Sequence, residues 1–166
     1  MLHSRIALAA AAALFLQFPT AANAATSAKA LHGSWTLVSL ESVDKEGKRT
    51  PSNLQKGLFI FLPNGHYALQ LYNKELPKFA SGNRMTGTPE ENKAVVQGSL
   101  AHFGTYKVEE KEGALTILPD GSSFPNWTGK EQPARKISIS GDQLTLVNPA
   151  PSAGGASSEL VFKRLK

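Results

Sequence analysis

The sequence contains no cysteine, and this absence excludes several classes of protein at once. Without thiols the chain can form no disulfide, no thiolate zinc site and no catalytic thiolate, and it cannot carry the lipid-modified cysteine of a lipoprotein. Its stability must therefore come from buried apolar surface and from paired backbone groups.

Long apolar runs are also missing after the N-terminal region, so no later segment predicts a membrane-spanning helix. Residues 1–24 have the pattern of an export signal, with a positive Arg5, an alanine-rich apolar stretch and a small-x-small site at Ala22-Asn23-Ala24. We expect residues 1–24 to be a signal peptide, residues 25–30 to be a disordered segment and residues 31–166 to form one domain. The expected location is the bacterial periplasm, with secretion as the alternative.

The sequence lacks the common motifs of metal, phosphate and nucleic-acid binding. His32, His66 and His102 are far apart and form no paired metal-ligand motif, and no glycine-rich phosphate loop is present. The net charge of +5 comes from scattered lysines and arginines and not from a basic track. We therefore predict no metal, no cofactor and no nucleic-acid partner.

Eight segments have the composition of β-strands, and short turns separate most of them. These segments are Ser34 to Val43, Gly57 to Leu62, His66 to Tyr72, His102 to Glu109, Ala114 to Leu118, Ala134 to Ser140, Gln143 to Val147 and Glu159 to Leu165. Consecutive strands joined by hairpins leave two exposed edges, which closure into a barrel removes. We predict an all-β fold, an eight-stranded antiparallel up-and-down barrel.

The main interruption is the insertion from Asn73 to Ala101. Within it, Thr88 followed by Pro89 and then Glu91 is a helix-start pattern, so we predict one short helix around residues 89–100. Such an insertion could cover one mouth of the barrel or be plain decoration.

Arg135 is the strongest pointer to a binding site. It shares the apolar face of its strand with Ile137 and Ile139, and a buried cation needs a carboxylate, carbonyls, water or a ligand anion. The same period-two reasoning turns His102 and Tyr106 inward. Arg135 could instead be neutralised by Glu131, or by the carbonyls of its own loop, and act only as a clamp.

The ordered set of motifs resembles the bacterial lipocalin-like domain proteins. The motifs are Gly33-Ser34-Trp35-Thr36-Leu37-Val38-Ser39, Pro63-Asn64-Gly65-His66-Tyr67, Phe103-Gly104-Thr105-Tyr106, Phe124-Pro125-Asn126-Trp127-Thr128-Gly129-Lys130-Glu131-Gln132, Arg135 and Gly141-Asp142-Gln143-Leu144-Thr145-Leu146. The chain departs from the family at Phe162-Lys163-Arg164, where a Trp often precedes the last basic residue. The resemblance implies a barrel with an internal cavity. It does not imply one activity, because related domains look like carriers in some settings and cyclase-like enzymes in others.

These observations favour a protein that binds a small, partly apolar molecule, which can be anionic, in the barrel cavity. The candidate ligand contacts are Arg135, Tyr106, Trp127, His102 and Asn126. Two alternatives stay open: a non-catalytic structural or interaction module with a filled barrel, and a cyclase or isomerase that uses His102 or Tyr106 as acid or base. We predict no catalytic residue from the residues themselves.

Overall fold

The computed structural model describes residues 27–166. The expected signal peptide of residues 1–24, together with residues 25 and 26, lies outside the described residues. Where the sequence predicted disorder up to residue 30, Ala28–Leu31 instead forms one helical turn, α1. The Ser27 hydroxyl caps this turn by accepting a hydrogen bond from the Ala30 backbone N–H.

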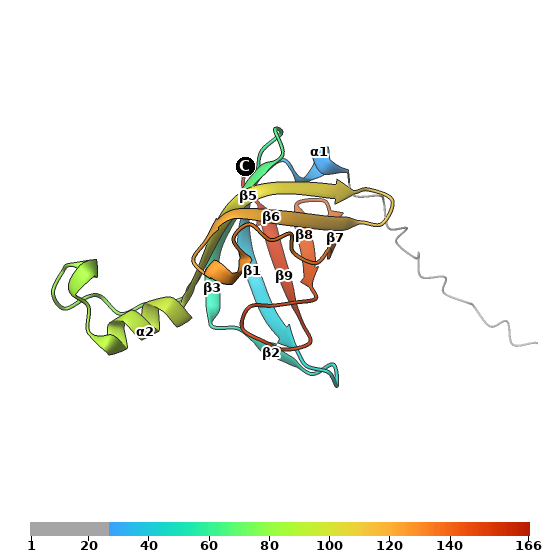
Figure 1. Cartoon of the computed structure of the whole chain (residues 1–166). Coiled ribbons are helices and arrows are strands. Elements are labelled where there is room, and N and C mark those ends of the chain that lie inside the picture. The colour runs from blue at the N-terminus through green and yellow to red at the C-terminus, as the bar shows by residue number, and fades with distance from the viewer. Residues whose placement is uncertain (1–26) are drawn as a thin grey trace, which may run out of the picture.

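Within residues 27–166, eight antiparallel strands close into a barrel and a ninth short strand, β2 (Arg49–Pro51), pairs with the end of β1 (Figure 1). The barrel strands are β1 (Gly33–Val43), β3 (Leu54–Phe61), β4 (His66–Asn73), β5 (Ser99–Glu109), β6 (Ala114–Ser122), β7 (Arg135–Ser140), β8 (Gln143–Asn148) and β9 (Ser157–Arg164). Each pairs with the next, and β9 pairs back onto β1. The predicted eight-stranded antiparallel barrel is confirmed.

The inward faces follow the period-two pattern of the strands. Tyr67, Leu69 and Leu71 of β4 are buried, as are Leu144 and Leu146 of β8. A bulge shifts the pairing of β5 with β6 between Phe103 and Gly104. Phe103 pairs with Gly121 but Gly104 pairs with Pro119, so the extra residue belongs to β6. The alternation of β5 therefore continues unbroken, and His102 and Tyr106 share the inner face.

The end of the barrel near α1 is closed by packed apolar side chains. Trp35, Phe61 and Phe162 are fully buried there, and Leu31 of α1 is buried against them. The Trp35 indole N–H donates to the Leu31 carbonyl at 2.8 Å, so a fixed hydrogen bond holds α1 against the barrel. We call this the closed end.

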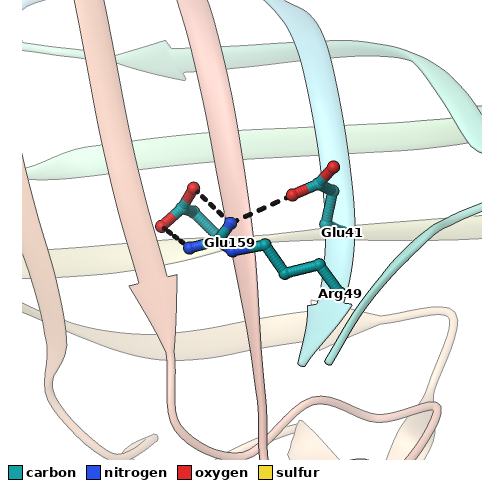
Figure 2. Close-up of polar contacts among 3 residues, drawn as sticks. All are labelled: Glu41, Arg49 and Glu159. Carbon is teal, nitrogen blue, oxygen red and sulfur yellow. Dashed lines mark hydrogen bonds and ion pairs between the residues drawn. The ribbon is translucent and has the colours of Figure 1, made fainter. Parts of the chain in front are cut away.

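The opposite end carries β2, which an arginine fastens to the barrel (Figure 2). Glu41 of β1 and Glu159 of β9 stand directly opposite each other in the strand pairing, an unfavourable arrangement of like charges. Arg49 of β2 bonds Glu41 at 3.0 Å and makes a two-pronged contact with Glu159 at 2.8 and 3.1 Å. The two carboxylates raise the pKa of Arg49, chiefly through the bonds to Glu159, and the cation offsets their mutual repulsion.

The predicted helix is present as α2 (Pro89–Gln97) and begins at the expected residue. The Thr88 hydroxyl and the Glu91 carboxylate form a reciprocal capping box at its start. The helix ends before residue 100 because Gly98 closes it and β5 already begins at Ser99. In Figure 1, α2 extends away from the barrel and does not lie over its mouth.

Candidate functional site

A cavity lies inside the barrel, between the packed closed end and the end that carries β2. Its lining is mostly apolar and includes seven leucines, and its polar members include Ser42, His102, Trp127, Arg135, Asn148 and Ser158. The volume open to the centres of water-sized molecules is about 80 Å³. One water needs roughly 10–15 Å³ on this scale, so the space accommodates several waters or a small ligand. The interior of the barrel is therefore not completely filled by side chains.

Among the described residues, Arg135 is the only member of this lining that is charged at neutral pH. It is the first residue of β7, where the apolar face of that strand meets the cavity, and it is only 4% exposed. Burial lowers the pKa of its guanidinium to about 10, so the side chain is still a cation at neutral pH. Within residues 27–166, no aspartate or glutamate lines the cavity.

The guanidinium of Arg135 has little compensation from the protein. In residues 27–166 its single hydrogen bond is from Nη1 to the Pro133 carbonyl at 3.3 Å, and it takes part in none of the ion pairs. The predicted alternative of neutralisation by Glu131 is not seen, since Glu131 is exposed and makes no such pair. A loop carbonyl does contribute, as the same alternative proposed.

The other guanidinium nitrogens of Arg135 border open space. Across the described part of the chain, Asn73 Oδ1 is the one side-chain polar atom that is fully enclosed and has no hydrogen-bond partner. No nitrogen of Arg135 is in that state. The Nε and Nη2 atoms of Arg135 have no protein partner there either, so they must retain accessible surface. Arg135 is also one of the residues that line the cavity. A fixed cation with free donors is suited to an anion.

His102 of β5 meets Tyr67 of the neighbouring strand β4 inside the barrel. The Tyr67 hydroxyl oxygen lies 2.9 Å from His102 Nδ1. Burial, and secondarily the charge of Arg135, lower the pKa of His102 to about 3, so its imidazole is neutral at neutral pH. Burial raises the pKa of Tyr67 well above its ordinary range, so the phenol keeps its proton.

Trp127 links the two polar groups of the cavity. It ends the 3₁₀ turn η2 (Pro125–Trp127) in the connection between β6 and β7, and it is buried. Its ring centroid lies 5.4 Å from that of His102 in an edge-to-face arrangement, and 5.9 Å from the guanidinium carbon of Arg135. Three of the predicted contacts, Arg135, His102 and Trp127, therefore meet at one cavity wall.

The other two predicted contacts have no place in the cavity lining. Tyr106 points inward as expected, but it lies toward the closed end, packs against Phe61 and donates to the Leu62 carbonyl at 3.0 Å. It is a core phenol with a satisfied hydroxyl. Asn126 is exposed, because its neighbour Trp127 takes the inward position of the same turn.

Sequence reasoning did not assign Tyr67, Asn148 or Ser158 to the site. Asn148 of β8 and Ser158 of β9 are buried, pair across the two strands and line the cavity. Strand parity could have found them, because Asn148 continues the inward series of Leu144 and Leu146. Tyr67 lies on the inner face of β4, but its contact with His102 needs the register between β4 and β5.

In the described residues, no group of three or more histidine, aspartate or glutamate side chains is placed to hold a metal. The same residues include no helix that is long and apolar enough to cross a membrane. Residues 32–165 match the model of a family described as a lipocalin-like domain. None of the curated proteins compared with the chain matches it.

Proposed function

The chain belongs to the lipocalin-like domain family, and we propose that it binds a small, partly apolar anion in the barrel cavity, with Arg135 as the counter-ion. The single observation that carries this proposal is the buried guanidinium of Arg135. It has one hydrogen bond to a carbonyl and no carboxylate partner in the described residues. A ligand anion would supply the missing charge.

The lining of the cavity supports an apolar body for that ligand. Apolar side chains, leucines above all, form most of the wall, and Trp127 offers an aromatic edge or face beside the cation. The volume of about 80 Å³ favours a short aliphatic or single-ring compound over a long lipid. We therefore propose a small carboxylate as the ligand class.

The two alternatives are less well supported. A solid structural barrel does not agree with the cavity. Catalysis by Tyr106 does not agree with its position away from the cavity, although His102 does face the cavity. Neither alternative explains an unpaired buried cation.

The test is isothermal titration calorimetry of the full domain with benzoate and hexanoate, with benzamide and hexanamide as neutral isosteres. We expect the carboxylates to bind more tightly than the amides. Arg135→Gln should weaken carboxylate binding by at least ~1.5 kcal/mol, the low end for a hydrogen bond to a charged group. Arg84→Gln, which removes an exposed arginine, is the matched control and should change nothing. Equal affinity in a folded Arg135→Gln protein would refute the role of the arginine.

We also propose that the protein is exported to a bacterial periplasm and cleaved after Ala24. The pattern of residues 1–24 supports this proposal. Expression of the full chain in a bacterium, osmotic shock and intact-mass measurement test it. A mature mass beginning at Ala25 in the periplasmic fraction is expected, and an uncleaved cytosolic chain would contradict it.

A further inference from the structure

The contact between Tyr67 and His102 has a direction, which proton counting reveals. Both side chains are neutral, so the phenol has one O–H and the imidazole has one N–H. Only one proton can lie between the Tyr67 hydroxyl oxygen and His102 Nδ1, which are 2.9 Å apart. If His102 donated, the Tyr67 O–H would have no acceptor in residues 27–166, since this is the hydroxyl's single hydrogen bond there. Donation by Tyr67 instead leaves the N–H of His102 Nε2 without a described partner, and that nitrogen keeps some accessible surface where water or a ligand can accept its proton.

This direction fixes where the imidazole keeps its own proton. When Nδ1 accepts, the N–H of a neutral histidine is at Nε2. No described residue forms a hydrogen bond with Nε2. This nitrogen is not fully enclosed by protein, so it keeps some accessible surface. His102 lines the cavity, and its ring meets the same indole as Arg135 does.

We propose that Tyr67 is a positioning residue that holds His102 in the Nε2–H tautomer, so that His102 supplies a second donor beside Arg135 for the two oxygens of a carboxylate. This inference rests on the proposed function and names the geometry of the same site. The cavity wall then offers a cation and a neutral donor with no competing acceptor charge. A planar, two-oxygen anion satisfies both donors, whereas an amide of the same shape brings a nitrogen that cannot accept.

The tautomer can be measured directly in the unliganded protein. We would label the histidines of the full domain with ¹⁵N and record long-range ¹H–¹⁵N correlations of the His102 ring at neutral pH. The wild-type protein should show a protonated Nε2 and an unprotonated Nδ1. In Tyr67→Phe the proton should be shared between the two nitrogens, because the phenol that selects Nδ1 as acceptor is gone. A wild-type His102 that carries its proton on Nδ1 overturns the inference even if the variant fails to fold.

Binding gives the second readout, with benzoate and hexanoate as probes. Tyr67→Phe should weaken the binding of benzoate and hexanoate by about fivefold, because the N–H of His102 Nε2 is then present only part of the time. The affinities for benzamide and hexanamide should stay within about twofold of wild type. Tyr106→Phe is the matched control, because it also removes a hydrogen-bonded phenol hydroxyl from the barrel interior but lies outside the cavity lining. Equal carboxylate affinities in the two tyrosine variants would overturn the inference.

The outcomes separate this inference from the proposed function. If wild-type protein binds neither benzoate nor hexanoate, or if Arg135→Gln binds them equally well, the proposed function fails and carboxylate selection by His102 fails with it. If binding depends on Arg135 and Tyr67→Phe matches Tyr106→Phe, the positioning role alone is wrong.

Discussion

The guanidinium carbon of Arg164 lies 4.0 Å from the centroid of the Trp35 ring, at the closed end of the barrel. The same guanidinium donates to the Ala30 carbonyl at 2.7 Å and to the His32 carbonyl at 2.9 Å. Arg164 therefore joins the last strand to the first strand and to α1. Trp35 is fully buried beneath it, so this end of the barrel is covered by an amphipathic side chain.

Arg164→Met should destabilise the domain by about 2–4 kcal/mol. The variant leaves two carbonyls of α1 and its flank without their charged donor, and it removes the cation from the indole face. Urea unfolding followed by tryptophan fluorescence measures the change. Lys163→Met, on the exposed face of the same strand, is the control and should lie within about 0.5 kcal/mol of wild type. Similar losses in both variants would mean that Arg164 does not clamp this end.

Arg135→Met should have the opposite effect and stabilise the protein by ~1–3 kcal/mol. An unpaired buried cation costs desolvation energy, and the flexible thioether can fill the same space without that cost. The measurement is again urea unfolding, in the absence of ligand. A clear loss of stability would instead favour the alternative in which Arg135 clamps its loop through the Pro133 carbonyl. A gain in stability combined with lost carboxylate binding would indicate a residue kept for binding.

Acid should destabilise the domain through His102. The folded-state pKa of about 3 lies below the ordinary value of 6.5, so the unfolded chain binds a proton in this window while the folded protein does not. The contribution of His102 to the free energy of unfolding is therefore complete above about pH 6.5. It is lost as the pH falls toward about 3, with a slope of at most ~1.4 kcal/mol per pH unit.

His102→Gln isolates this contribution from the titration of the carboxylates. Urea unfolding between about pH 7 and about pH 4 should show a shallower decline in the variant than in wild type. His66→Gln, at an exposed histidine of β4, should follow the wild-type curve. Parallel curves for wild type and His102→Gln would show that folding does not change the pKa of His102.

Gly104→Ala should destabilise the barrel by at least ~3 kcal/mol, because the bulge of β6 brings backbone against this glycine. A Cβ atom built there would overlap the Leu118 carbonyl oxygen, and a backbone atom cannot turn aside. Gly121→Ala, near the same bulge, is the comparison because its Cβ would meet only the Phe103 ring, which is exposed and can rotate. Thermal unfolding should give Gly121→Ala a clearly higher melting temperature than Gly104→Ala. The reverse order would show that the strands can separate at the bulge.

The sequence by itself determined the eight strands of the barrel, the closure of the barrel and the faces on which the inward residues lie, although it did not predict the short strand β2. Alternation along β7 was enough to place Arg135 inside, and alternation along β5 was enough for His102, because the side-chain period of a strand is local and does not depend on its partners. The start of α2 at Pro89 was equally predictable from local sequence, since the capping box is formed by residues within one helical turn.

Only the tertiary structure decided which inward residues share the cavity. Parity assigns a face but not a height in the barrel, and the height follows from the tilt and stagger of strands that pair across long sequence separations. Tyr106 and Tyr67 both lie on the inner face, yet Tyr106 lies against Phe61 near the closed end, whereas Tyr67 reaches His102. The packing of the turn after β6 also decided two features of the site. It leaves Asn126 exposed and, within residues 27–166, leaves Arg135 without a carboxylate partner. This packing depends on side chains from strands that are distant in the sequence.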